Sequence, residues 1–355
     1  MVHQNIGIRF KGIAVMIDDG CRGREADTYI LMTKLAHIPA AIHIFGDTEQ
    51  GLPVHISSID KSFNEFVNRS QKSLMKRLLQ QGFPNITLLR QYRMHYKLLA
   101  FPKKRFYNDE LFSVGSANVY IKPKVADCLK EILELEKPDT EYIRLLYVKV
   151  ANAKLRYTSS PPSRVNLETL EWVLGAVRKL NSVFGKDTQA KVLMITPYHR
   201  QATEYRKAMY DERRRDNERV GIIDYAQFAS VCTVEEARGY EAEIVILGLV
   251  DVRADRVDDF SGMADEDKAY LAVARATKVL WIIGGRFEGY SARLRELRHA
   301  VLEYKRMICR TGSCIPVKAP RPTRPIPHDL ATPGELREAN LVDRLRDTRR
   351  RVRLR

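Results

Sequence analysis

The amino-acid sequence predicts an α/β protein built on a doubly wound, mostly parallel sheet. Apolar segments of strand length alternate with longer helical patterns along most of the chain, as in sheets that carry helices on both faces. Short polar or basic motifs follow several strands, where such sheets bind ligands. The chain has 355 residues, of which 45% are hydrophobic, so one large or two ordinary domains can bury a core.

The first residues predict a small βαβ unit. Residues 12–19 read as an apolar strand that ends in two acids, residues 25–37 as a helix, and residues 41–46 as a second apolar strand. Because the links between these elements are short, we expect the two strands to pair in parallel.

A connector and a mixed region come next. Residues 51–63 read as the connector and residues 64–81 as a basic helix, followed by a strand at 86–89. The region after residue 103 is mixed and contains a charged helical stretch near 125–136. We expect the larger sheet to follow this region.

The larger sheet is expected from about residue 143 onward. Its strands are expected at 143–150, 191–196, 229–234, 243–250 and 279–284. Its helices are expected at 166–183, 199–215, 266–277 and 288–307. Strands and helices that alternate in this way are typical of a doubly wound sheet.

Charge and composition restrict the class of partner. The formal net charge of +16 favours a polyanion, nucleic acid before an acidic membrane, although a solvated basic surface would carry the same charge. No apolar run reaches the roughly 18 residues of a membrane span, and the first residues lack the apolar core of a signal sequence. The five cysteines show no metal-binding or redox spacing. We therefore expect an intracellular protein, cytoplasmic or nuclear, that does not bind membranes.

Acidic and amide side chains follow the two strands of the predicted βαβ unit. Asp18 and Asp19 end the first strand, where carboxylate oxygens would suit Mg²⁺. Strand-end acids that cap a helix or begin a turn would look the same. Gln50 comes shortly after the second strand and could hold a water or a phosphate oxygen through its amide. A polar turn is the alternative at that position.

Two arginines are candidates for phosphate binding. Arg93 lies in the segment QYRMH at 91–95, and its guanidinium could donate two parallel, charge-assisted hydrogen bonds to a phosphate. Its neighbour Tyr92 offers a flat face to a base. Arg275 comes just before the last strand and could serve as an arginine finger on a γ-phosphate. An ordinary surface turn is the alternative for Arg93.

Hydroxyl and aromatic groups follow two strands of the larger sheet. Thr196, Pro197 and Tyr198, with Gln201 close behind, suit the backbone of a single-stranded nucleic acid. Thr233 ends the next strand and is followed by the segment RGYE at 238–241.

Taken in order, these motifs resemble motifs II to VI of superfamily 1 helicases. The series is IDD, GDTEQ, QYRMH, TPYHRQ, TVEEARGYEAEIVIL and VARATKVLWIIG. It looks most like the Upf-type group, which includes the nonsense-mediated-decay helicase. The segment LLRQYRMHYKLLAFPKKRFYNDEL is very close to the pattern of that group, and the likeness covers residues 13 to about 290.

The resemblance implies two RecA-like lobes of a P-loop NTPase, which hold ATP and Mg²⁺ between them and bind single-stranded RNA or DNA. Asp18 would hold Mg²⁺ through water, Asp19 would stand at the position of the water-activating glutamate, and Gln50 would sense the γ-phosphate. Arg93 and Arg275 would reach the phosphates from the second lobe. The residues expected near the nucleotide are Tyr92, Gly239 and Glu241. The residues expected to face the nucleic acid are Thr196, Pro197, Tyr198 and Thr233.

The resemblance also implies a division of the chain. Residues 1–60 would be a remnant of the first lobe, and residues 64–310 would be the second lobe. Residues 311–355 are rich in proline and arginine, and this composition, rather than the resemblance, predicts a disordered tail.

The sequence departs from the family pattern in several places. It contains no G-x-x-x-x-G-K-[ST] segment, whose backbone N–H groups and lysine hold the phosphates. Asp19 replaces a glutamate, and Arg238 replaces the glutamine of motif V. Tyr270 and Ala274 replace the asparagine and threonine of motif VI. We therefore expect the isolated chain not to hydrolyse ATP.

Three interpretations of the chain remain open. It is part of an ATP-dependent helicase, completed by upstream sequence or by a protein partner that supplies the missing lobe. Alternatively, it is a non-catalytic module that binds single strands or a protein. The third interpretation is a gene fragment without a selected activity.

Overall fold

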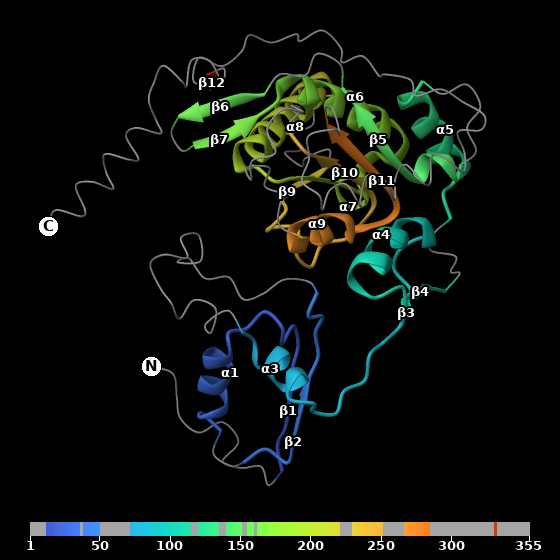
Figure 1. Ribbon diagram of the computed structural model, residues 1–355. Helices are drawn as coiled ribbons and strands as arrows, with labels where there is room; N and C mark the ends of the chain where they lie inside the picture. Colours follow the sequence, from blue (N-terminus) through green and yellow to red (C-terminus); the bar gives the residue numbers. More distant parts are fainter. Residues whose placement is uncertain are drawn as a thin grey trace, which may run out of the picture. The chain divides into compact units, whose positions relative to one another are not determined.

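The chain forms two compact units, residues 1–88 and residues 89–355 (Figure 1). The computed structural model describes residues 12–35, 38–49, 72–114, 120–134, 140–150, 155–159, 162–220, 229–250, 266–284 and 330–331. The division at residues 60–64 that the resemblance implies stays a prediction. Most of the predicted tail lies outside the described residues.

The first unit contains the predicted βαβ arrangement. β1 (Ala14–Ile17) pairs in parallel with β2 (Ala41–Ile44), and α1 (Glu25–Met32) lies between them in the chain. The helix ends at Met32, earlier than expected, and the Thr33 hydroxyl just after it donates to the carbonyl of Ile30 at 2.8 Å. The parallel pairing expected from the sequence is confirmed.

A second helix, α3 (Leu74–Gln80), packs against α1 in this unit. The Ser73 hydroxyl caps its first turn by accepting from the backbone N–H of Lys76 at 3.1 Å, as N-cap serines do. Arg77 reaches across to Glu25 at 2.6 Å and to the hydroxyl of Tyr29 at 2.8 Å. The predicted helix at 64–81 is confirmed over this span, and residues 64–71 lie outside the described part of the chain.

The second unit is built on a five-stranded parallel sheet. In chain order its strands are β5 (Leu145–Lys149), β8 (Val192–Thr196), β9 (Ser230–Thr233), β10 (Ala242–Gly248) and β11 (Ala276–Gly284). Their order across the sheet is β5-β11-β10-β8-β9, and each neighbouring pair is parallel. The predicted α/β fold is confirmed, and the sheet is consistent with a RecA-like P-loop NTPase lobe.

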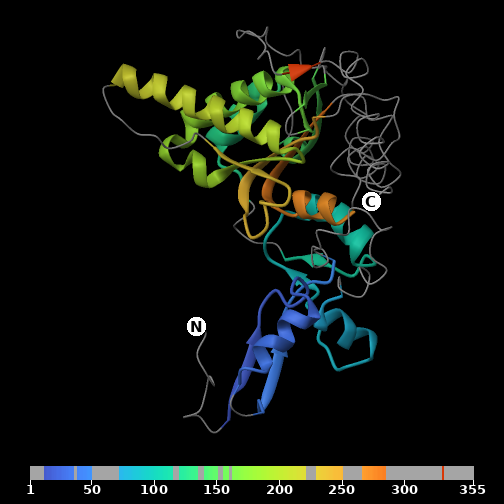
Figure 2. The ribbon, with the colours of Figure 1, turned by 90° about the vertical axis from the view of Figure 1, so that its left-hand side faces the viewer.

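Helices cover both faces of this sheet. One face carries α5 (Pro123–Ile132), α6 (Leu167–Phe184) and α8 (His199–Val220), and the other carries α4 (Tyr96–Phe106) and α9 (Glu266–Val273) (Figure 1). Figure 2 shows α4 and α9 together on their side of the sheet. The short helix α7 (Thr188–Lys191) leads into β8. Of the helices that the structure describes, none is both long and apolar enough to cross a membrane.

Alternate residues of the strands fill two separate cores. Ile246 of β10 packs beneath α5, α6 and α8, whereas its neighbour Val245 packs toward α4 and α9. Trp281 of β11 is fully buried in the first core, and its indole N–H donates to the carbonyl of Ile143 at 2.9 Å. This bond satisfies the polar end of a large apolar side chain.

Two small sheets flank the main one. β6 (Arg156–Ser159) and β7 (Pro162–Val165) form an antiparallel hairpin, and β12 (Leu330–Ala331) pairs antiparallel with β6. β3 (Arg90–Gln91) pairs in parallel with β4 (Phe112–Ser113). The sequence did not predict any of these strands.

Two sequence predictions were wrong in detail. The strand expected at 86–89 is absent, because Ile86 and Leu88 are 90% and 82% exposed and no strand pairs with them among the described residues. The helix expected at 266–277 ends at Val273, and β11 already begins at Ala276. The helix expected at 288–307 lies outside the described residues.

Candidate functional site

A tight turn after β3 carries the predicted residues Tyr92 and Arg93. The side chain of Gln91 organises it: Oε1 accepts from the backbone N–H groups of Arg93 at 3.0 Å and Met94 at 2.9 Å. Nε2 donates to the Met94 carbonyl at 2.7 Å and to the Ser113 hydroxyl at 2.5 Å. With all of these groups bonded, the turn presents Arg93 at a fixed position. Tyr92 is 61% exposed.

Arg93 forms an ion pair with Glu241, another predicted residue of the nucleotide site. Arg93 Nε lies 2.9 Å from Glu241 Oε2, and the two side chains are 44% and 55% exposed. Glu241 directly precedes β10, and Gly239 has a φ of +79°, which favours glycine at this turn. Two motifs that lie far apart in the sequence therefore meet here.

Arg275 is the buried member of the same group. It is 3% exposed, and it lies in the turn between α9 and β11 rather than on the predicted helix. Its Nε donates to the Leu271 carbonyl at 3.0 Å, and Nη1 donates to the Tyr240 carbonyl at 3.3 Å. In this structure Arg275 therefore supports the peptide next to Glu241. Arg93, not Arg275, is the arginine that faces solvent.

His95 connects the turn of Arg93 to β11 through a backbone hydrogen bond. Its backbone N–H donates to the Thr277 carbonyl at 2.9 Å, and its Nδ1 accepts from the backbone N–H of Lys97 at 3.4 Å, which caps α4. Nε2 lies 3.5 Å from Glu141 Oε2. Burial, together with the positive charge of Arg144, lowers the pKa of His95 to about 4. The ring is therefore neutral at pH 7.

The carboxylate of Glu141 contacts three basic side chains, those of His95, Lys97 and Arg144. It lies 3.0 Å from Lys97 Nζ and accepts from Arg144 Nε at 2.7 Å. The sequence-based list of site residues did not include Gln91, His95 or Glu141. The first two stand in the motif QYRMH, which could have revealed them, whereas Glu141 carries no motif.

The Arg93 group lies where the strands of the main sheet begin, which we call its amino-terminal edge; the carboxyl-terminal edge is where the strands end. Glu241 precedes β10 and Arg275 precedes β11. Thr196 and Thr233 instead end β8 and β9, and all of these strands are parallel. The residues expected at the nucleotide and those expected at the nucleic acid therefore occupy opposite edges of one sheet.

At the carboxyl-terminal edge the predicted residues differ in exposure. Thr196 is fully buried and Thr233 is 7% exposed, whereas Pro197 and Tyr198 are half-buried. The Thr196 hydroxyl oxygen is buried without a hydrogen-bond partner among the described residues. Pro197 and Tyr198 are therefore the side chains of this group that can meet a ligand in the present conformation, and Tyr198 is the aromatic one.

The turn after Thr233 is closed by Glu236. Its Oε2 accepts from the backbone N–H of Thr233 at 2.8 Å, and the Thr233 hydroxyl accepts from the backbone N–H of Glu236 at 3.3 Å. Arg206 donates to the same Oε2 at 2.5 Å and to the Val231 carbonyl at 3.1 Å. The hydrogen bond from the Thr233 N–H lowers the pKa of Glu236, and Arg206 lowers it further against the opposing effect of burial.

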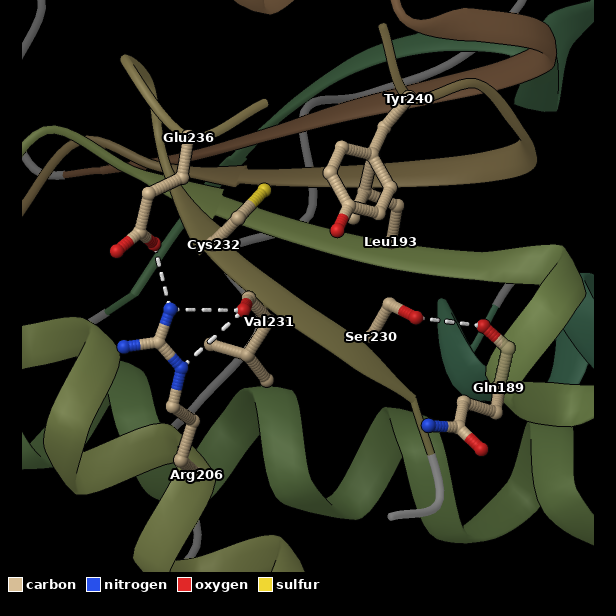
Figure 3. A pocket seen from close by; sticks show the side chains of 8 residues that line it. All are labelled: Gln189, Leu193, Arg206, Ser230, Val231, Cys232, Glu236 and Tyr240. Carbon is tan, nitrogen blue, oxygen red and sulfur yellow. Dashed lines mark hydrogen bonds and ion pairs between the residues drawn. The ribbon is translucent and has the colours of Figure 1, made fainter. Parts of the chain in front are cut away.

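Arg206, Val231 and Glu236 line a pocket of about 300 Å³ beside the edge strand β9 (Figure 3). Its lining residues are Gln189, Leu193, Arg206, Ser230, Val231, Cys232, Glu236 and Tyr240. Val234 donates to Thr196 of β8, so the polar backbone groups of Val231 and Thr233, at alternate positions, point away from β8. Arg206 and Glu236 bind these outward groups, which would otherwise be open for pairing with another strand.

The acids of the first unit form a turn rather than a cluster. Asp18 Oδ1 accepts from the backbone N–H of Asp19 at 2.9 Å, and Asp19 Oδ2 lies 2.9 Å from Arg22 Nη1. Among the described residues no three His, Cys, Asp or Glu side chains are grouped to hold a metal. One carboxylate fits Mg²⁺ bound mainly through phosphate oxygens and water, but not a site made of protein ligands alone. Gln50 lies outside the described residues.

Comparisons with known proteins identify relatives of this chain. A family model described as an AAA domain (AAA_12) matches residues 70–286. The chain is 28% identical over 273 residues to an uncharacterized ATP-dependent helicase, MJ0104, of Methanocaldococcus jannaschii, which covers 76% of this chain and 35% of that protein. It is 28% identical over 273 residues to helicase sen1 of Schizosaccharomyces pombe, with 76% of this chain and 14% of that protein covered.

A third relative is the human RNA helicase Mov10l1. It is 24% identical over 297 residues, which cover 79% of this chain and 23% of that protein. The chain thus spans between 14% and 35% of the length of these relatives. The family model covers more than half of the chain and includes the whole main sheet. The chain therefore belongs to the AAA domain family, in the form found in helicases of superfamily 1.

Proposed function

We propose that this chain is the second RecA-like lobe of an Upf-type ATP-dependent helicase, together with the end of the first lobe. In the full-length motor it would bind one side of ATP and couple its hydrolysis to movement along single-stranded RNA or DNA. Residues 64–310 would form this lobe, and a first lobe supplied by further sequence or by a protein partner would complete the site.

The observation that carries this proposal is the group formed by Arg93, Glu241 and Arg275. Three motifs that the resemblance assigns to the nucleotide meet at one edge of the sheet, through the Arg93–Glu241 ion pair and the Arg275–Tyr240 hydrogen bond. Arg93 is partly exposed and has the fork of donors that suits a phosphate. Glu241 contacts that guanidinium through Nε.

Two tyrosines beside this group would meet the rest of a nucleotide. Tyr92 and Tyr240 are 61% and 54% exposed, and each directly precedes a residue of the ion pair in the chain. Exposed aromatic faces next to a phosphate-binding arginine suit the base and sugar of a nucleotide. ATP bound with Mg²⁺ would supply the phosphoryl group for hydrolysis, and the resemblance alone assigns Asp18 to the metal.

The nucleotide side is tested by titrating the protein with a fluorescent ATP analogue. We expect weak binding that falls about tenfold in Arg93→Ala, since one charge-assisted bidentate contact is lost. Lys104→Ala is the matched control, because Lys104 is an exposed cation on α4 outside this group. Equal losses in both variants, or no binding to the wild type, would count against a nucleotide site.

A non-catalytic module is the second candidate function. It is favoured by Asp19, whose carboxylate already pairs with Arg22. On this view the chain binds single strands and has no use for ATP. Binding of a labelled single strand that is unchanged by ATP and by Arg93→Ala would support this candidate over the motor.

The net charge of +16 supports a nucleic-acid partner for both candidates. Fluorescence anisotropy of labelled oligo(U) and oligo(dT) tests it, with binding expected to weaken steeply between about 50 and 200 mM salt. If neither oligonucleotide binds at about 50 mM salt, neither candidate stands.

A further inference from the structure

The residue just before α6, Asn166, connects three segments at the carboxyl-terminal edge of the sheet. It is fully buried, and its Oδ1 caps α6 by accepting from the backbone N–H of Thr169 at 2.9 Å. Its Nδ2 donates to the carbonyl of Val250, just after β10, at 3.2 Å. A single side chain therefore fixes the start of a helix relative to the end of a strand.

Gln201 binds the main chain of the same residue. Its Oε1 accepts from the Asn166 N–H at 2.7 Å, and its Nε2 donates to the Asn166 carbonyl at 3.2 Å. Gln201 is fully buried, and only a carboxamide can serve both peptide groups. The glutamine of TPYHRQ thus fixes the end of the β6–β7 hairpin against the start of α8, close to Tyr198.

Backbone strain is stored at this edge. Val250 is β-branched and fully buried, yet it has a φ of +64°, a conformation that such residues rarely adopt. Strain of this kind persists where the surroundings impose it, and it is frequent at binding sites. Here the hydrogen bond from Asn166 to the Val250 carbonyl is part of those surroundings.

Arg164 of the hairpin lies against two tyrosine rings. Its guanidinium carbon is 5.5 Å from the ring centre of Tyr157 and 5.4 Å from that of Tyr198. Tyr157 stands directly opposite Arg164 in the hairpin, whereas Tyr198 follows β8. A hydrogen bond from the backbone N–H of Arg200 to the Ser163 hydroxyl, at 3.3 Å, also joins α8 to β7. All three members of the stack are half-buried, so solvent reaches part of each.

We propose that Tyr157, Arg164 and Tyr198 form a stacking platform for single-stranded nucleic acid, and that Gln201 is the residue that positions it. Below, these three side chains are called the platform. This inference rests on the proposed function, since it extends the nucleic-acid side of the same lobe to the β6–β7 hairpin. Aromatic faces held around a cation bind bases and backbone without regard to sequence.

The platform explains how this edge can bind a strand although both threonines are buried. Thr196 and Thr233 are at most 7% exposed, so in this conformation they leave little surface for contact. The platform adds positive charge and ring surface beside Tyr198, and it lies on the same edge as the strained Val250. The two hydrogen bonds of Gln201 keep the hairpin from moving away from Tyr198 when a base packs on it.

Anisotropy titrations with labelled oligo(U) and oligo(dT) test the platform. We expect Arg164→Met to weaken binding about tenfold, which corresponds to the loss of one stacked and charged contact, and to reduce the slope of log affinity against log salt by about 1. Arg164→Lys should keep the salt slope but bind more weakly than wild type, because an ammonium cannot stack as a guanidinium does. Lys186→Met, which removes an exposed cation before β8, is the control.

Gln201→Leu tests the positioning role. We expect weaker binding with an unchanged salt slope, since no surface charge is removed. A purely structural glutamine would alter the thermal midpoint and leave the affinity of the remaining folded protein as it was. Affinity equal to wild type in folded Gln201→Leu would overturn the positioning role.

Photo-crosslinking of the wild-type protein gives a measurement that needs no variant. A thiouridine oligonucleotide should crosslink to peptides that contain Tyr157 or Tyr198. Crosslinks found only elsewhere, or equal affinities for Arg164→Met and Lys186→Met, would overturn the platform while leaving the proposed function intact. Wild-type protein that binds no single strand would instead defeat the proposed function itself.

Discussion

Arg93 and Glu241 meet at a distance of 2.9 Å, although one follows β3 and the other precedes β10. Their side chains are 44% and 55% exposed, and exposed ion pairs contribute about 0.2–1 kcal/mol. A phosphate could therefore replace the carboxylate on Arg93 at small cost. The ion pair is therefore compatible with the phosphate contact proposed for Arg93.

A double-mutant cycle should show how weak this pair is. We expect Arg93→Ala, Glu241→Ala and the double variant to give a coupling of at most about 1 kcal/mol in urea denaturation, smaller still at high salt. A coupling above about 2 kcal/mol, a value typical of buried networks, would mean that the pair is a fixed structural element.

His95 should make the second unit sensitive to mild acid. Burial lowers its pKa to about 4 in the folded protein, from an ordinary value of 6.5. The unfolded chain therefore binds more protons between these values. The contribution of His95 to stability is fully present above pH 6.5 and is lost as the pH falls toward about 4. Charged groups around the ring are Arg144, Lys97 and Glu141.

His95→Asn should flatten this pH dependence, because asparagine can cap α4 but does not titrate. Thermal midpoints measured from pH 7 to 4 would show the difference from wild type shrinking as the pH falls. Parallel curves for the two proteins would show that His95 contributes nothing to the acid response.

Glu236 should contribute stability that acid removes. Its pKa is lowered from 4.5, first by the Thr233 N–H and then by Arg206. Its contribution is therefore present above pH 4.5 and is lost as the pH falls through the lowered pKa. Glu236→Ala should cost about 1 kcal/mol at pH 7 and progressively less in acid.

Glu235→Ala is the matched control for this variant. Glu235 also forms an ion pair, with Lys268 at 2.5 Å, whereas it is Glu236 that bonds the backbone of the edge strand. We expect a smaller loss at pH 7. Denaturation midpoints at several pH values compare the two variants. Equal losses would show that the bond from Glu236 to the edge strand β9 adds no stability.

Trp281→Phe should destabilise the main core. The indole N–H bond to the Ile143 carbonyl is lost and a buried acceptor remains unpaired, which costs about 1–3 kcal/mol with the added effect of lost volume. Circular dichroism measures the loss, and Trp172, 6.2 Å away between ring centres, still reports tertiary structure by fluorescence. A midpoint equal to wild type would contradict this account.

The sequence predicted the main sheet well because its strands are buried runs such as Val192–Thr196, which have a clear apolar signal. It missed the β6–β7 hairpin because the two strands are separated by serines and prolines, residues that indicate a loop. The expected strand at 86–89 has the same apolar pattern as a real strand, but no neighbour buries it.

The candidate site was predicted in part. Motif residues such as Arg93 and Glu241 were found one by one, while their pairing depends on how the chain returns to the sheet. The burial of Thr196 and the support that Arg275 gives to Tyr240 could not be read from a motif. Residues such as Glu141 act through contacts alone, so spacing gave no signal for them.

The short segment between Thr233 and Ala242 runs from one edge of the main sheet to the other, since it joins the carboxyl end of β9 to the amino end of β10. It is therefore a direct covalent connection between the two edges. It includes the turn that Glu236 closes and Gly239, whose φ is +79°, and it ends at Glu241, which pairs with Arg93. On the proposed function, the nucleotide and the single strand would therefore lie at opposite ends of one loop.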